Sequence, residues 1–160
     1  MRRSSAGFSL IELLIVVAII LIIAAIAIPN LLKSKMAANQ SSAVASLRTL
    51  NTAEVTYSTA YNVGYSSTLA QLGPPASGNA TSTTAGLIDS VLAAGTKSGY
   101  SFTYTPSATD ASGNTNGYVL TANPITPGQT GQNFYYSDDL SVIRQNSQST
   151  AGASDSPIGG

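Results

Sequence analysis

Few residues of this chain have side chains that commonly do chemistry. The sequence contains no Cys and no His, which removes cysteine nucleophiles, disulfides, Cys or His metal sites and the commonest general base. Its acidic residues number seven and are widely spaced, and only Asp138 and Asp139 are adjacent. No separated pair of carboxylates suggests general acid and base catalysis. The sequence therefore predicts a protein that is not an enzyme.

One carboxylate is set apart by its position. Glu12 lies at the start of an apolar segment, four residues after Phe8, and residues 13–32 carry no charge. A charge near bilayer depth costs about 2.5 to 3.5 kcal/mol on insertion scales, so such a residue usually has a partner and a function. If the chain were cut between Gly7 and Phe8, the new α-amino group would be a cation one helical turn from Glu12. The two groups could then pair, within one chain or between neighbouring copies.

The segment that follows Glu12 is long enough to cross a membrane. Residues 13–28 form an unbroken apolar run, and a spanning helix needs about twenty such residues. Three explanations compete with a functional Glu12. A buried soluble helix is disfavoured, because so long an apolar run leaves no polar face for water. The other two are a secretory signal peptide cleaved at Ala25-Ile26-Ala27, which would leave residues 28–160 as a soluble binding domain, and an uncleaved anchor. Neither explains a carboxylate at this position.

The residues around Glu12 carry a resemblance to a known family. The segment resembles the signal of type IV prepilins and of the related pseudopilins of type II secretion, and it reads Gly7-Phe8-Ser9-Leu10-Ile11-Glu12-Leu13-Leu14-Ile15-Val16-Val17-Ala18-Ile19-Ile20. The resemblance implies cleavage after Gly7 by a prepilin peptidase, N-methylation of Phe8, and a role for Glu12 in registering subunits during assembly. A basic residue often precedes the scissile Gly in the family, whereas Ala6 does here.

The resemblance also implies partners and a location. A type IV pilin is a single-pass protein of the inner membrane before it is assembled, by a membrane platform and its ATPase, into a helical homo-oligomeric extracellular filament. Such filaments act in adhesion, twitching motility or DNA uptake. A pseudopilin would instead build a short periplasmic filament for type II secretion. The absence of Cys weakens the pilin assignment, because many type IV pilins close their last loop with a disulfide.

The apolar helix is expected to continue past Pro29, which resembles the helix-bending proline of many pilins. Apolar residues recur at helical spacing, and they are Leu32, Met36, Val44, Leu47, Leu50, Tyr57 and Tyr61. A proline removes a backbone donor inside a helix, so a kink is predicted at Pro29. The opposite face is mostly polar, and the pattern ends at Gly64.

Alternating residues predict an antiparallel sheet in the C-terminal half. Strands are expected at residues 100–105, 118–122, 133–137 and 140–144, a short helix at 86–95, and a loop at 69–78. The predicted fold is an α+β lollipop, with the amphipathic part of the long helix covering the sheet. The expected segments are a leader (1–7), a transmembrane and polymerisation helix (8–32), its amphipathic continuation (33–62), a globular β domain (63–144) and a flexible tail (145–160).

The composition argues against nucleic-acid binding and gives no firm metal site. Charged residues make up 9% of the chain and the formal net charge is zero, whereas duplex binding needs many basic residues. Two acidic clusters, residues 110–116 and Asp138-Asp139, are the candidates for calcium, which prefers six to eight oxygen ligands. The first cluster has a single carboxylate and reads as a turn, so no cofactor is expected.

Overall fold

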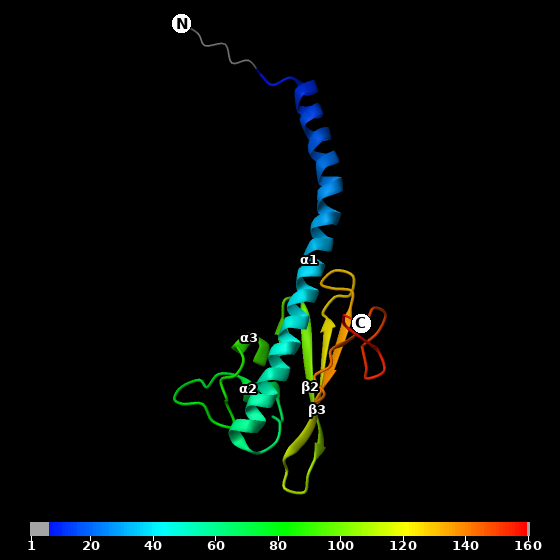
Figure 1. The fold of residues 1–160 in the computed structure, drawn as a ribbon. Helices are drawn as coiled ribbons and strands as arrows, with labels where there is room; N and C mark the ends of the chain where they lie inside the picture. Colours follow the sequence, from blue (N-terminus) through cyan, green and yellow to red (C-terminus); the bar gives the residue numbers. More distant parts are fainter. Residues whose placement is uncertain (1–6, 160) are drawn as a thin grey trace. The chain divides into compact units, whose positions relative to one another are not determined.

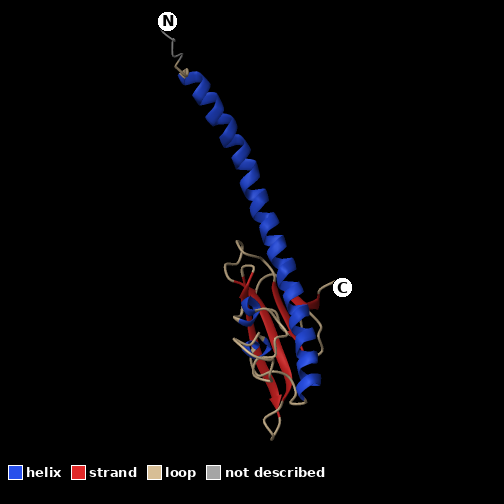
Figure 2. Ribbon diagram, turned by 90° about the vertical axis from the view of Figure 1, so that its left-hand side faces the viewer, coloured by secondary structure: helices blue, strands red, loops and turns tan. Residues whose placement is uncertain are grey.

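The fold comes from a computed structural model that describes residues 7–159 (Figures 1 and 2). The helices are α1 (Leu10–Tyr61), α2 (Leu69–Leu72) and α3 (Ser90–Ala93). The strands are β1 (Thr96–Lys97), β2 (Tyr100–Thr109), β3 (Thr115–Pro124), β4 (Phe134–Asp138), β5 (Arg144–Asn146) and β6 (Ser156–Pro157). Two compact units divide between Lys35 and Met36, within α1. A long helix with a six-stranded antiparallel sheet confirms the predicted α+β class.

The first unit consists of the N-terminal part of α1 and the residues before it. Its side chains from Gly7 to Lys35 are exposed, apart from the half-buried Ala24. This stretch contains the one helical window among the described residues that is long and apolar enough to cross a membrane, with a mean hydropathy of 3.3. Nothing else in its own unit covers the apolar surface, so lipid or another chain has to do so.

In the second unit, α1 lays one face against the sheet. The buried positions follow the spacing of three and four residues that places side chains on one stripe, and they include Ala43, Leu47, Leu50, Glu54 and Tyr57. Its exposed face carries hydroxyl side chains that bond back to the helix itself. Thr49, Thr52 and Thr56 each donate to the carbonyl oxygen four residues earlier, at 2.8 to 3.0 Å. The solvent face of α1 is therefore polar in composition but largely satisfied internally.

The six strands are arranged in chain order, from β1 at one edge to β6 at the other. All pairs are antiparallel, and β2 pairs with β3 from Tyr100 opposite Pro124 to Thr109 opposite Thr115. Alternate residues face α1 and are buried, as period-2 patterning requires, and they are Tyr100, Phe102, Tyr118, Leu120, Ala122, Tyr135 and Ser137. The core of this unit thus lies between the second half of α1 and one face of the sheet.

Polar contacts fix the helix on the sheet at the end where α1 enters the second unit. The Asn39 side chain donates to the carbonyl oxygen of Thr130 at 2.8 Å. The Gln40 side-chain oxygen accepts from the backbone N–H groups of Gln132 and Asn133, at 3.3 and 3.0 Å. These amides hold the loop between β3 and β4 against α1.

Several predicted elements are shorter or shifted in the structure. The strand predicted at residues 140–144 begins only at Arg144. A turn closed by the Ser141 N–H and the Asp138 carbonyl at 2.8 Å comes first, and Ser141 adopts a left-handed conformation (φ 59°). The helix predicted at 86–95 is reduced to α3, whose N-terminus is capped by the Asp89 carboxylate bonding the Leu92 N–H at 2.9 Å. The loop predicted at 69–78 contains α2, which buries Leu69 and Leu72.

The segment predicted as a flexible tail instead completes the sheet. β5 and β6 pair with each other, and Asp155 closes the loop between them. Its carboxylate accepts from the Asn146 side chain at 3.0 Å and from the Gly152 N–H at 2.8 Å, and its carbonyl oxygen accepts from Arg144 at 2.9 Å. Ala151 is buried beneath this loop. We call these contacts the Asp155 clasp; the segment has no periodicity that would have revealed it.

The close contact between Gly131 and the Tyr100 side chain predicts how a larger residue at position 131 would change stability. A Cβ atom on Gly131 would overlap the hydroxyl oxygen of Tyr100, which is fully buried and donates to the Asn133 carbonyl at 2.8 Å. Gly131→Ala should therefore lower the free energy of unfolding by about 1 to 3 kcal/mol, the usual cost of overpacking. Thermal unfolding of the full chain in detergent measures the loss. Gly152→Ala is the control, because a Cβ there meets no atom within 4 Å; equal stability of the two variants would contradict the prediction.

Candidate functional site around Glu12

The candidate site is the stretch from Gly7 to Glu12 at the start of α1. Gly7, Phe8 and Ser9 precede the helix in irregular backbone, and a Cβ on Gly7 would meet nothing within 4 Å. Phe8 is 78% exposed. A peptidase needs its scissile bond in an accessible, non-helical segment, and the Gly7–Phe8 bond meets that requirement. Residues 1–6 of the predicted leader, with Arg2 and Arg3, lie outside the described residues.

The Glu12 carboxylate caps the helix that it belongs to. Its Oε2 accepts from the backbone N–H of Ser9 at 2.9 Å, and the Leu13 N–H bonds to the Ser9 carbonyl at 3.2 Å. This is one half of a capping box, in which an acidic residue three positions after a Ser satisfies an orphan N–H of the helix N-terminus. Sequence analysis missed the role of Ser9, although the Ser-x-x-Glu spacing of residues 9–12 was visible.

The cap does not neutralise the Glu12 carboxylate, because its hydrogen-bond partner is a backbone N–H and not a cation. Within the described part of the chain the single ion pair joins Lys97 and Asp89 at 2.8 Å, far along the sequence from Glu12. Beyond Glu12 the helix exposes large apolar side chains, for instance Leu14 at 63% and Ile22 at 62%. An anion at one end of an uncovered apolar helix is thus the geometry that the sequence predicted.

Pro29 lies inside α1, and the helix continues on both sides of it. It lacks the N–H that would bond to Ala25 four residues earlier. The kink predicted at this position stays a prediction, as do cleavage, methylation of Phe8 and subunit registration by Glu12.

Comparison with known proteins identifies the class of this N-terminal segment. Residues 2–28 match the prokaryotic N-terminal methylation motif. Two curated relatives match as well: a type IV major pilin protein, PilA, of Myxococcus xanthus, and a type IV wide pilus major component, PilA4, of Thermus thermophilus. The N-terminal segment is therefore similar to that of type IV pilins, which confirms the resemblance read from residues 7–20.

The similarity is confined to the N-terminal part of the chain. The Myxococcus protein is 55% identical over 51 residues, which are 32% of this chain and 23% of the relative. The Thermus protein is 62% identical over 37 residues, which are 23% of this chain and 28% of the relative. The chain thus matches about a quarter of the length of these relatives, and no solved structure matches it. Both names describe pilus components and neither describes an enzyme.

The two candidate calcium clusters, residues 110–116 and Asp138-Asp139, form turns. The Asp110 carboxylate accepts from the backbone N–H groups of Ser112 and Asn114, at 2.8 and 2.9 Å. Asp138 likewise accepts from the Leu140 N–H at 3.2 Å. Across the described residues no group of three or more acidic side chains gathers as a metal would require. The structure gives these carboxylates a turn-forming role.

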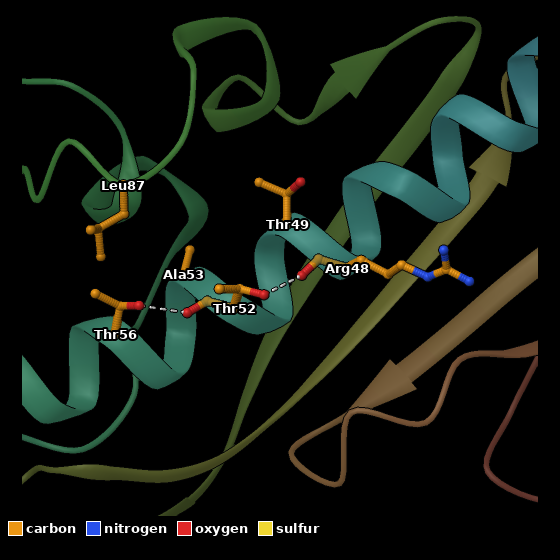
Figure 3. A pocket seen from close by; sticks show the side chains of 6 residues that line it. All are labelled: Arg48, Thr49, Thr52, Ala53, Thr56 and Leu87. Atoms are coloured by element: carbon orange, nitrogen blue, oxygen red, sulfur yellow. Dashed lines mark hydrogen bonds between the residues drawn. The ribbon is translucent and has the colours of Figure 1, made fainter.

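A shallow depression of about 320 Å³ lies beside α1, between the helix and Leu87 (Figure 3). Its lining holds one charged side chain, Arg48, which points away from Leu87 in Figure 3. The hydroxyls of Thr52 and Thr56 are turned onto the helix backbone rather than into the depression. It therefore offers neither a nucleophile nor a general base, and it does not resemble a catalytic pocket.

Sequence analysis also missed a buried carboxylate in the globular unit. Glu54 is fully buried, because its spacing from Leu50 and Tyr57 places it on the apolar stripe of α1. Its two oxygens accept from the backbone N–H and the hydroxyl of Ser66, at 2.8 and 2.6 Å. Tyr104 in turn donates to the Ser66 carbonyl. Glu54 thus ties the loop after α1 to the helix, and burial raises the pKa of its carboxyl above the ordinary value.

The raised pKa of Glu54 predicts how the stability of the protein changes with pH. Because the folded-state pKa of Glu54 lies above its unfolded value, its contribution to stability is present at acidic pH and is lost as pH rises through the folded-state pKa. Glu54→Gln should flatten that decline between about pH 4 and the folded-state pKa. Thermal unfolding of the full chain in detergent across this range measures the slope.

Asp110→Asn is the matched control for this experiment. Backbone and side-chain N–H donors lower the pKa of the Asp110 carboxyl, so its contribution has the opposite sign and is lost as pH falls. An unchanged slope in Glu54→Gln would show that Glu54 titrates alike in the folded and unfolded chains.

Proposed function

We propose that this protein is a structural subunit of a type IV pilus. In this proposal a prepilin peptidase cuts after Gly7, Phe8 is N-methylated, and the N-terminal half of α1 polymerises into an extracellular filament. The observation that carries the proposal is the uncovered apolar surface of α1, which begins at a single carboxylate, Glu12, and belongs to a segment that matches pilus components.

The physical case rests on what can cover that surface. Before assembly, lipid solvates the helix, which fits a single-pass precursor of the inner membrane. After extraction, only other copies of the same helix supply a comparable apolar surface. Ten fully buried aliphatic side chains would contribute about 15 kcal/mol relative to water. The gain relative to lipid is much smaller, so an assembly ATPase acting through a membrane platform is needed to drive extraction.

The second half of α1 is suited to burial between copies. Burying a hydroxyl without a partner costs free energy, yet Thr49, Thr52, Thr56 and Thr59 already bond to backbone carbonyls of the helix. A neighbouring subunit can cover this face without leaving their donors unpaired. We infer that α1 contributes to packing along its whole length.

The decisive experiment is intact mass measurement and N-terminal sequencing of protein sheared from the cell surface. A chain that starts at methylated Phe8 and is recovered in filaments is the expected result. The same processed chain confined to the cell envelope would indicate a secretion pseudopilin instead. A terminus at Met1 or Ile28 would contradict both assignments, since it would mean no cleavage or cleavage by a signal peptidase.

Substitution of Glu12 separates a registration role from helix capping. Glu12→Val should keep the protein in the membrane but reduce filament yield, because insertion becomes easier while the charge is lost. Glu12→Gln is the informative partner variant, since its side-chain oxygen can still accept from the Ser9 N–H. Registration by charge predicts that both variants assemble poorly, as judged by sheared filament yield. Normal yield in Glu12→Gln would leave capping as the residue's role.

A further inference from the structure

The β2–β3 hairpin extends beyond the rest of the sheet. β1 pairs only with Tyr100 and Ser101 of β2, and β4 pairs only with residues 119–122 of β3. Past these points the sheet consists of these two strands only. Thr115 also bridges to Gly64 and its carbonyl accepts from the Tyr65 N–H at 2.7 Å, and the buried Tyr118 donates to the Asn51 side chain at 3.1 Å. We call residues 105–118 the ribbon. It lies at the end of the globular unit where α1 ends (Figure 1).

The two strands of the ribbon differ in exposure, because Thr115, Gly117 and Tyr118 of β3 are buried within the globular unit. Thr105 to Thr109 are all exposed. Addition of another strand to its open β2 edge is unfavourable, because Pro106 has no N–H to donate and Ala108 has a left-handed backbone (φ 51°). A partner of the ribbon must therefore contact its side chains and its turn.

Three of the six carboxylates of the globular unit lie at this end. Asp110 is at the tip of the ribbon, and Asp138 and Asp139 follow β4 beside its base. The Asp139 carboxylate lies 3.4 Å from the position of a Cβ on Gly117, within the ribbon. The described residues place no cation within 4 Å of these three carboxylates, whereas Asp89 pairs with Lys97. The ribbon end is therefore negative.

Two lysines come shortly before the globular unit in the sequence of α1. Lys33 and Lys35 are exposed and directly precede Met36, where that unit begins. We call residues 33–35 the neck. The contacts of Asn39 and Gln40 with residues 130–133 define this end of the unit, opposite the ribbon. Among the described residues neither lysine forms an ion pair.

We propose that the ribbon of one copy docks on the neck of a second copy, with Asp110, Asp138 and Asp139 facing Lys33 and Lys35. The inference rests on the proposed function and names the contact that would order successive subunits. A contact between two different surfaces of the same chain is heterologous, and such contacts build open polymers where the rotation does not close a ring. Charge complementarity of this kind acts mainly on register and on the rate of association.

Cross-linking of assembled protein tests the contact directly. A carbodiimide couples a lysine amine to a carboxylate that already touches it and adds no spacer. Applied to filaments of the full chain, it should give a ladder of covalent multimers whose linked peptides join Lys33 or Lys35 to the ribbon-end aspartates. The ladder should disappear in a variant with Lys33→Gln and Lys35→Gln. Links confined to single chains, or links to a different protein, would overturn the proposal.

Charge reversal supplies the functional test. Asp139 makes no side-chain hydrogen bond within the described residues, so Asp139→Lys should fold normally. It should reduce filament yield about tenfold, because like charges then face each other. Lys35→Asp should do the same, and the double variant should recover most of the yield. The control carries Gln148→Lys and Ser149→Lys, two exposed positions outside both surfaces that change the net charge equally.

The outcomes separate this inference from the proposed function. If the wild-type chain and the control form no filaments, the pilus assignment itself fails. If every variant assembles as the wild type does, the filament stands and the ribbon does not dock on the neck. Equal loss in the control would show that net charge, and not this contact, determines assembly.

Discussion

Among the described residues of its own unit, the apolar half of α1 has no partner, and the rest of the structure depends on that constraint. A helix that exposes Leu14 and Ile22 to more than half of their surface is unfavourable in water, and its apolar surface needs a cover of lipid or of another chain. The globular unit must therefore fold without help from this segment. It does so by using only the second half of α1, together with the sheet, to build its core.

Two buried polar groups make the position of α1 on the sheet specific. Asn51 donates to the Ser137 hydroxyl at 2.8 Å and accepts from Tyr118 at 3.1 Å. One helical turn further on, Glu54 holds Ser66. Apolar contacts alone tolerate small shifts of a helix along a sheet, whereas a buried polar group left unpaired costs about 1 to 3 kcal/mol. These contacts therefore favour one register of the helix.

How much the sequence predicted depended on how regular each pattern was. The apolar run, the spacing of Leu47, Leu50 and Tyr57, and the alternation around Phe102 repeat often enough to indicate elements correctly. Short features carried no such repeat. β1 and β6 have two residues each, and the left-handed Ser141 that delays β5 has no sequence signature. Glu54 was overlooked because a carboxylate on an apolar stripe reads as an interruption until its partner, twelve residues later, is seen in space.

The Asp155 clasp has a consequence for how the protein matures. Closing a terminal loop with a disulfide ties folding to an oxidising compartment and to thiol exchange, which takes seconds to hours. This chain has no cysteine and closes the loop with hydrogen bonds from Arg144, Asn146 and Gly152 to Asp155. Such a closure forms as fast as the chain folds, opens reversibly, and is indifferent to reductants. The last strands can thus reach their final arrangement under any redox condition, without an oxidoreductase.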